Sequence, residues 1–440
     1  MEPEKLTFRK VNQDILATLG RPGKGYLALL ALALGLIVLW WVAEYFQLNR
    51  GLGVAGYAHP VFWAFDITNF VFWVGIAHSG TLISAILFLF RAKWRVSVYR
   101  SAEAMTVFAI MTAGLFPIIH MGRAWFFYWL FPYPSQRLIW PNFRSPLIWD
   151  VFAISTYFTV SAMFFFLGLL PDIAACRDRF ADWRRRIYAF LSLGWQGTTR
   201  QWKHYGAAYL FFAGLATPLV VSVHSVVSWD FAMSIVPGWH STIFAPYFVA
   251  GAIFSGSAMV LTLLILFRKA FKLEAYITNQ HFENLAKVVL LTSLIVSYSY
   301  LTEFFIVHYN HNAVEDAGFA FRAGGHYALL FWIMLTCNSV IPLSLFFPRV
   351  RRSIPALFAI SLAINLGMWM ERFVIIVTSL AHEFMPYAYG IYHPTWVDYS
   401  LTAGSFGWFF FLFLSFVRLF PAVSLTEVKE HLGHSGGEAG

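Results

Sequence analysis

Ten long apolar runs follow one another along the chain, separated by short polar stretches. Each run is about 18 residues or longer with few charges, which is the length an α-helix needs to cross the hydrocarbon core of a membrane. The pattern therefore predicts ten transmembrane helices, near residues 26–48, 68–90, 104–121, 147–170, 206–229, 243–267, 287–308, 324–348, 354–380 and 398–420.

These runs also decide the class of fold. Backbone polar groups find no water inside lipid, so only helices and closed barrels can span it, and the alternating pattern of barrel strands is absent from the sequence. We predict an all-α integral membrane protein. Segment 183–195 is shorter and carries three arginines after Trp183, so we expect a helix in the membrane interface. No small-residue cleavage site follows the first run, so a signal peptide is not expected.

Lysine and arginine are distributed unevenly between the two sides of the predicted bundle. Cytoplasmic loops carry an excess of basic residues, so placing the N-terminus in the cytoplasm gives the orientation that fits. We therefore expect both termini to be cytoplasmic, with 1–25 as an N-terminal tail and 422–440 as a disordered C-terminal tail. Of the 31 basic residues, the ones left outside are Arg50, Arg123, Arg137, Arg144, Arg322 and Arg372.

Composition and charge narrow the range of partners. With 59% hydrophobic residues, the chain cannot form a soluble globule. The net charge of +9 is accounted for by contact with anionic lipid at the inner leaflet, so no nucleic acid is expected. Cys176 and Cys337 are the two cysteines, whereas an iron–sulfur cluster takes about four, so any cluster must belong to a partner.

Two of the predicted helices resemble one another. GIAHSGTLISAILFLFR (75–91) and GAIFSGSAMVLTLLILFR (251–268) run in the same direction four helices apart, and their paired Gly and Ser residues would allow close helix packing. This repeat predicts two four-helix bundles, helices 2–5 and 6–9, related in parallel about an axis normal to the membrane. The expected divisions are 26–50 for peripheral helix 1, 60–230 and 240–382 for the bundles, and 396–421 for peripheral helix 10. Coincidence between two apolar helices is the alternative.

Several ionisable residues fall at one depth, near the outer ends of the predicted helices. A charged group inside lipid costs about 3 kcal/mol or more, so each needs a partner or a function. Aromatic residues such as Trp125, Trp140 and Trp149 surround this layer, as they would in an interfacial belt. The ionisable members are His120, Asp150, His224, Asp230, Glu303, His308, Glu371 and Arg372.

His120 and Asp150 are suited to the oxidation of a quinol, which releases two electrons and two protons. Imidazole accepts a proton near neutral pH, and a nearby carboxylate can orient it and pass the proton outward. On this hypothesis Asp230 extends the exit route, Arg372 balances the carboxylates, and His224 is a further quinol-site residue. The alternative is that these groups cap helix ends or snorkel to the interface.

Other polar residues are weaker candidates. A proton path could use His78, Asp172, Glu303 and His308, although packing or capping explains them equally well; the same holds for Asp66, His326 and His382. A haem between His120 and His224 would need facing histidines, and no second pair recurs at another depth. Phosphate-binding and metalloprotease motifs are absent, so no metal site is expected. A secondary transporter or a structural anchor remains an alternative class.

The stretch FPIIHMGRAWFFYWLFPYPSQRLIWPNFRSPLIWD (116–150) resembles the ActC family, the large NrfD-like membrane subunits of bacterial alternative complex III. Segments 69–91, 215–256 and 290–309 are similar to the same family, and the likeness covers most of 60–420. In that family the quinol site uses a histidine and an aspartate, which correspond here to His120 and Asp150. Asp230 and Arg372 correspond through shorter motifs.

The resemblance implies a haem-free and metal-free subunit that binds menaquinol or ubiquinol on the periplasmic side of the bacterial inner membrane. It implies electron transfer to an iron–sulfur cluster-bearing periplasmic subunit, then to multihaem c-type cytochrome subunits, beside a second NrfD-like membrane subunit. The outer loop 121–147 would be the docking surface for the cluster-bearing partner. A membrane anchor of a polysulfide or nitrite reductase-like complex is the nearest alternative within the family.

Overall fold

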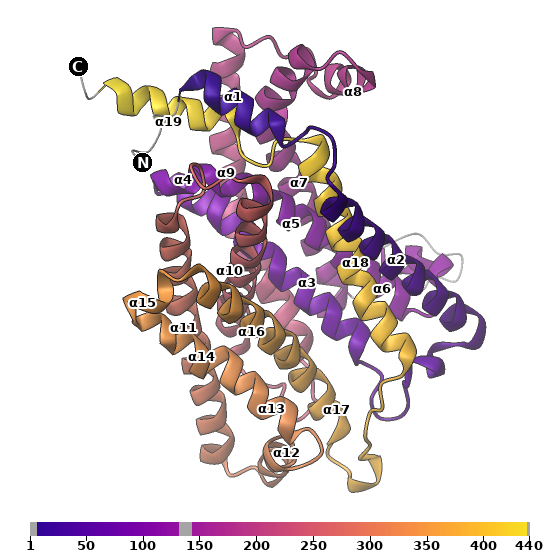
Figure 1. The fold of residues 1–440 in the computed structure, drawn as a ribbon. Helices are drawn as coiled ribbons and strands as arrows, with labels where there is room; N and C mark the ends of the chain where they lie inside the picture. Colours follow the sequence, from indigo (N-terminus) through magenta and orange to yellow (C-terminus); the bar gives the residue numbers. More distant parts are fainter. Residues whose placement is uncertain (1–6, 132–142, 438–440) are drawn as a thin grey trace.

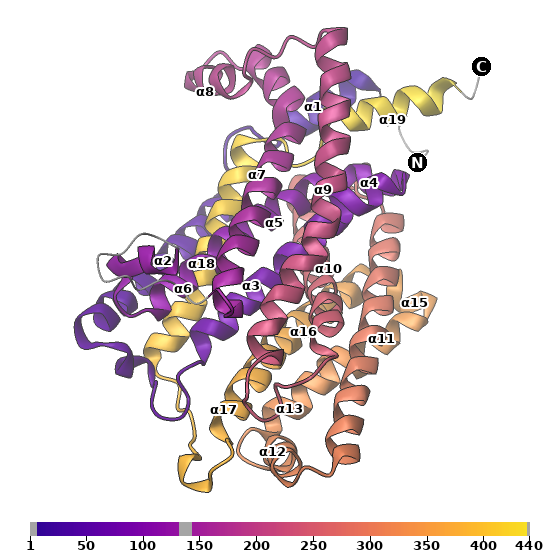
Figure 2. The same cartoon turned by 180° about the vertical axis from the view of Figure 1, so that it is seen from behind.

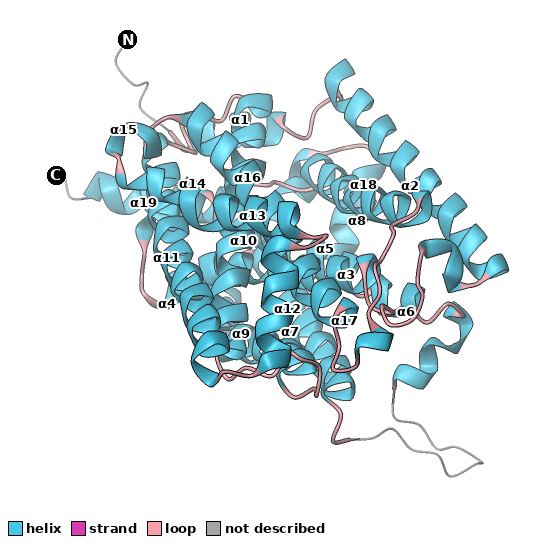
Figure 3. Ribbon diagram, turned by 90° about the horizontal axis from the view of Figure 1, so that it is seen from below, coloured by secondary structure: helices cyan, strands magenta, loops and turns pink. Residues whose placement is uncertain are grey.

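The computed structural model describes residues 7–131 and 143–437. Over these residues the protein is helical with no β-strand, and ten helices are long and apolar enough to cross a membrane, which confirms the prediction (Figure 3). In chain order the spans are α2 (Lys24–Arg50); α3 (Phe65–Thr81), continued by the π-helical turn η2 (Leu82–Ile86) and α4 (Leu87–Leu89); α5 (Tyr99–Ala113) with α6 (Leu115–His120); α7 (Pro146–Arg179); α9 (Thr199–Ala232); α10 (Phe244–Phe271); α11 (Asn279–Asn310); α13 (Ala328–Leu335) with η5 (Thr336–Val340), α14 (Ile341–Leu343) and η6 (Ser344–Phe346); α16 (Ile354–Phe373) with η7 (Val374–Thr378) and α17 (Ser379–Ala381); and α18 (Trp396–Leu419).

Shorter helices lie between and beyond the spans. The predicted interfacial segment forms one of them, α8, over Trp183–Leu191. The others are α1 (Phe8–Ala17), η1 (Leu52–Ala55), η3 (Lys93–Ser97), η4 (Ala124–Leu130), α12 (Ala313–Gly324), α15 (Pro348–Arg351), η8 (Pro386–Ala388) and α19 (Leu425–Gly437).

The spanning helices group as the internal repeat predicts. Helices α3, α5, α7 and α9 pack together as the first bundle, and α10, α11, α13 and α16 pack as the second. The repeated helices α3 and α10 lie side by side where the two bundles meet. Helices α2 and α18 pair with each other at the periphery, against α3 and α5 (Figures 1 and 2).

Small residues set the close contact between α3 and α10. The Ser79 hydroxyl donates to the Ile253 carbonyl at 2.7 Å and lies 3.1 Å from the Ser257 hydroxyl. A Cβ added to Gly256 would lie 2.6 Å from the Ile76 carbonyl oxygen, closer than real Cβ atoms approach. Gly80 plays the same part against α5. The predicted close approach through Gly and Ser residues is therefore present.

Helices α1, α8 and α19 gather at one end of the molecule, and we refer to it as the inner end because the basic residues predict it to be cytoplasmic (Figure 1). Here the structure differs from the disorder predicted for 422–440, since α19 forms and docks. Thr426 donates its hydroxyl to Asp172 at 2.9 Å, and Glu427 pairs with Arg95 at 3.1 Å. Composition alone does not predict this anchoring because it depends on buried partners far away in sequence.

Candidate functional site

A cavity of about 340 Å³ opens at the outer end of the first bundle, between α3, α6, α7 and α9. Three of the predicted residues, His120, Asp150 and Asp230, line it together. Apart from Ser155, the remaining wall is apolar and aromatic, and includes Trp63, Ile67, Phe70, Val71, Ile118, Phe127, Phe131, Leu147, Ile154 and Phe231. The cavity therefore combines an apolar surface with a few titratable groups, which is the usual composition of a small-molecule site.

A break in the third span shapes this cavity. Helix α5 ends at Ala113 and α6 begins at Leu115, with Gly114 between them. Pro117 follows and has no N–H to bond back to the preceding turn, so the regular ladder is interrupted. Both Gly114 and Pro117 face the cavity, and α6 ends at His120, which the break therefore helps to aim at the cavity.

Asp150 and Asp230 come together because α7 and α9 are antiparallel neighbours. Asp150 lies near the start of α7 and Asp230 near the end of α9, so both are at the outer end, and their carboxyl groups are within hydrogen-bonding reach of each other. Among the described residues the Oδ1 atom of each has no hydrogen-bond partner. Each carboxyl group therefore keeps one oxygen free for a ligand, which helix capping alone does not explain.

The carboxylate next to His120 is Asp66, for which the sequence supports only a path or cap role. Its Oδ2 lies 3.5 Å from the His120 Nδ1, and the Asp66 side chain is fully buried in the first turn of α3. Asp150 shares the cavity with His120, but Asp66 rather than Asp150 is at ion-pair distance. The sequence feature that could have identified Asp66 is its depth, because it lies at the outer end of a span, level with the predicted layer of ionisable residues.

His224 does not belong to the outer cavity. It lies nearly two turns deeper in α9 than Asp230, and its ring meets the ring of His78 at a centroid distance of 4.5 Å. Both histidines are fully buried near the junction of the bundles, and the His78 Nδ1 lies 2.6 Å from the Val74 carbonyl oxygen. His224 therefore does not fit the outer quinol-site role expected of it.

Arg372 lies in the second bundle, where it pairs with its neighbour Glu371 at 2.9 Å and faces the Phe248 ring at 4.5 Å. Glu371 also accepts hydrogen bonds from Tyr300 and Asn338. The expected role of Arg372 in balancing Asp150 and Asp230 is wrong in this arrangement, since its charge is matched locally. The direction in which a side chain points around its helix cannot be read from the sequence.

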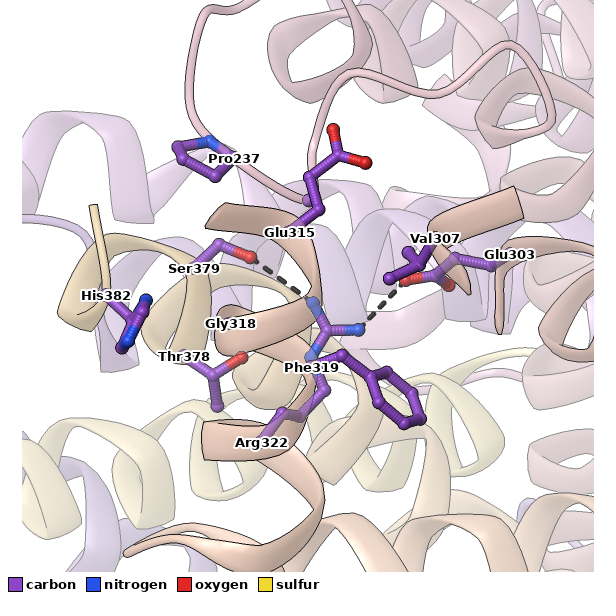
Figure 4. Close-up of a pocket in the computed structure, with 11 residues that line it drawn as sticks. Pro237, Glu303, Val307, Glu315, Gly318, Phe319, Arg322, Thr378, Ser379 and His382 are labelled. Atoms are coloured by element: carbon purple, nitrogen blue, oxygen red, sulfur yellow. Dashed lines mark hydrogen bonds and ion pairs between the residues drawn. The ribbon is translucent and has the colours of Figure 1, made fainter. Parts of the chain in front are cut away.

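The remaining predicted residues lie in two other places. Glu303 forms a 2.9 Å ion pair with Arg322 of α12 in a small cavity at the outer end of the second bundle, close to Ser379 and His382 (Figure 4). His308 is exposed one turn further along α11, so it lies beside this cavity. Asp172 is at the inner end, bonded to Arg100 at 3.1 Å. A single path through all of these residues is not formed.

The outer surface beside the first cavity is aromatic. On η4, Trp125, Phe127 and Trp129 expose about half of their side chains. Part of the loop predicted to dock a partner, residues 132–142 with Trp140, lies outside the described residues. No group of three or more metal-binding side chains occurs in the described ranges.

The ten spans and this cavity define a multi-pass membrane protein with a cluster of titratable groups facing its outer side. The chain belongs to the NrfD family: the family described as "Polysulphide reductase, NrfD" matches residues 53–382, which contain both bundles. The chain is also similar to a protein of Halobacterium salinarum named as a putative membrane subunit of dimethyl sulfoxide reductase, with 29% identity over 256 residues, 58% of this chain and 54% of that protein. It thus spans about half the length of the curated relative it matches. Family membership at the NrfD level is confirmed.

Proposed function

We propose that the outer cavity of the first bundle binds and oxidises a quinol, menaquinol or ubiquinol, and that this chain is the quinol-binding membrane subunit of a bacterial respiratory oxidoreductase. The observation that carries the proposal is the meeting of His120, Asp150 and Asp230 on one aromatic-lined cavity. Membership of the NrfD family, whose description names a reductase, supports a redox role.

The chemistry of the cavity fits a quinol head group. Its aromatic and aliphatic walls suit a flat ring, and the Oδ1 atoms of Asp150 and Asp230 have no protein donor among the described residues. A quinol brings two hydroxyl donors, which would satisfy acceptors that are otherwise costly to bury. The fit therefore rests on unpaired polar atoms as well as on shape.

Two proton acceptors match the two protons of the reaction. Oxidation of a quinol to a quinone releases two protons and two electrons. One hydroxyl proton passes to His120 and the other to the Asp150–Asp230 pair, and both groups lie at the outer end, where the protons are released. The electrons leave to a redox centre of a partner docked beside η4.

The narrower assignment is to alternative complex III, in the bacterial inner membrane. The partners would then be an iron–sulfur cluster-bearing periplasmic subunit, multihaem c-type cytochrome subunits and a second NrfD-like membrane subunit. The exposed aromatic residues of η4 support docking at this end, because exposed apolar patches mark interaction surfaces.

A second candidate is the membrane anchor of a terminal reductase. It is favoured by the name of the relative from Halobacterium salinarum, which refers to dimethyl sulfoxide reductase. Both candidates use the same quinol chemistry and differ in where the electrons go. Purifying the native complex and recording its haem spectrum separates them: c-type haem absorption supports the first, and its absence with a molybdenum cofactor supports the second.

The test of quinol oxidation is His120→Gln in the assembled complex, with His308→Gln as a matched control at the outer end of the second bundle. We expect His120→Gln to lower quinol oxidation by about 10²-fold or more, as loss of a general base does. His308→Gln should remain near wild type. Retained quinol oxidation in a fully assembled His120→Gln complex would eliminate the proposed site.

A further inference from the structure

His120 stands between the cavity and a second carboxylate that the cavity does not reach. His120 lines the cavity, whereas Asp66 does not, although its Oδ2 lies 3.5 Å from the imidazole Nδ1. The side chain of Asp66 is fully buried and that of His120 is 20% exposed. The imidazole therefore presents Nδ1 to Asp66, which leaves Nε2 as the nitrogen available to a molecule in the cavity.

The carboxylate of Asp66 has no hydrogen-bond partner among the described residues. Neither carboxylate oxygen receives a hydrogen bond within residues 7–131 and 143–437, and the contact to Tyr57 is made by the Asp66 backbone N–H, which donates to the phenol oxygen at 3.2 Å. Burying a carboxylate without a donor or counter-ion is expensive. An imidazolium at His120 is the nearest group that would relieve this cost.

Further acidic and phenolic groups lie behind Asp66, on the side away from the cavity. Glu44 of α2 and Asp398 of α18 are close enough for their charges to interact with that of Asp66. Each has one buried oxygen with no partner among the described residues. The Tyr57 ring packs edge-on against the His120 ring at 5.5 Å and lies 6.0 Å from the Tyr392 ring. Together these side chains form a polar cluster between His120 and helices α2 and α18.

The polar cluster behind His120 reaches two loops at the outer end. The Tyr392 hydroxyl donates to the Ala55 carbonyl at 3.2 Å, and the Thr395 hydroxyl donates to the Val54 carbonyl at 2.7 Å. Tyr57 and Tyr392 lie outside the spans, and burial raises the pKa of both phenols, so they stay neutral and can relay hydrogen bonds. The polar cluster therefore extends from the Nδ1 side of His120 to the outer loops.

We propose that Asp66 is a positioning residue for His120, and that the proton His120 accepts leaves behind the cavity through Asp66 toward Glu44 and Asp398. Asp66 holds the tautomer with a proton on Nδ1, so that Nε2 is free to take a hydroxyl proton from the quinol; the Nδ1 proton then passes to Asp66. The second proton leaves separately through Asp150 and Asp230. This inference rests on the quinol oxidation proposed above.

The first test is Asp66→Asn, which keeps the size of the side chain but removes its charge and its ability to accept a proton. We expect kcat for quinol oxidation to fall by about 10²-fold while KM and the affinity for a quinol-analogue inhibitor change by less than about threefold. The control is Asp316→Asn on α12, which makes the same chemical change in the second bundle and should leave kcat near wild type.

A pH profile separates positioning from a purely structural role. Removing the anion takes away the counter-ion of the imidazolium, so the acidic limb of kcat should move to lower pH in Asp66→Asn, and Asp66→Glu should restore part of the wild-type profile. The titratable groups that face this pair are Glu44, Tyr57, Asp150, Asp230, Tyr392 and Asp398.

Glu44→Gln provides a second test that leaves His120 and Asp66 in place, in case Asp66→Asn does not assemble. A severalfold fall in kcat is expected, and unchanged kcat and pH profile in Glu44→Gln and Asp398→Asn together would overturn the exit route. If His120→Gln abolishes activity but Asp66→Asn behaves as wild type, the inference alone fails. If His120→Gln is active, the quinol site itself fails.

Discussion

The outer ends of the two bundles are built on the same helical plan and reach opposite results. In the first bundle, a cavity of about 340 Å³ contains the acids Asp150 and Asp230 with no basic partner other than His120 on its lining. At the outer end of the second bundle the cavity is only about 20 Å³, and α12 places Arg322 against Glu303 beside it (Figure 4). A buried acid that is neutralised by its own chain is unavailable to a ligand, whereas an unpaired acid can still bind one.

The same contrast continues deeper in the membrane. Glu371 and Arg372 form an ion pair in the second bundle, and Tyr300 and Asn338 donate hydrogen bonds to Glu371. The first bundle has the histidine pair His78 and His224 instead. The two bundles thus share a helical plan and differ in charge pairing. The acids of the second bundle are paired with arginines, whereas those lining the cavity of the first bundle are not.

Removing the unpaired acids of the first bundle should have the largest effect and is the strongest test of this difference between the bundles. Asp150→Asn combined with Asp230→Asn should lower kcat for quinol oxidation by about 10²-fold or more, since both carboxylate acceptors disappear. Glu303→Gln with Arg322→Met, the matched change in the second bundle, should leave activity per assembled complex near wild type. Equal losses in the two double variants, measured by quinol oxidation, would show that the bundles do not differ in function.

The closed end of the second bundle should depend on its ion pair for stability. Arg322→Met alone leaves the Glu303 carboxylate buried without its partner, so we expect a loss of about 3–5 kcal/mol in unfolding free energy. Thermal unfolding of the purified complex measures it. The double variant with Glu303→Gln should recover most of the loss, and failure to recover would mean that Arg322 acts through packing alone.

The histidine pair between the bundles tests for additional proton transfer. If protons cross through His78, then His78→Phe should lower the proton-to-electron ratio in vesicles to the value set by quinol oxidation alone, with electron transfer still active. Ser101→Ala at the inner end is a control that should leave the ratio unchanged. An unchanged ratio in His78→Phe would remove this residue from any mechanism.

The smallest effect is expected at α19, outside the spans. Burial raises the pKa of Glu427 even though Arg95 and Arg100 oppose the shift. The docked helix therefore holds the proton more tightly than the free helix, so docking is strongest below the ordinary glutamate pKa of about 4.3 and weakens as pH rises through the raised value. Hydrogen exchange over residues 425–430 at several pH values measures this, and Glu427→Gln should remove the pH dependence. A docking strength that increases with pH would contradict it.

Much of the fold could be predicted from the sequence, because the lipid imposes long apolar runs and the repeat of α3 in α10 shows the two-bundle plan. The meeting of His120, Asp150 and Asp230 also follows from their shared depth. Depth does not tell which way a side chain points around its helix, so it associates Arg372 with the wrong acids and His224 with the wrong layer. It also gives Asp66 too little weight, because the partner of Asp66 lies on a different span.

Helix α19 has a consequence for assembly. It follows every spanning helix along the chain, yet it binds Arg95 and Asp172 of the first bundle. Its docking can take place only after all ten spans have been translated. The contact between α19 and the first bundle would therefore form only in a completely inserted protein. Cleavage by a protease near residue 425 would then detect chains in living cells whose insertion is unfinished.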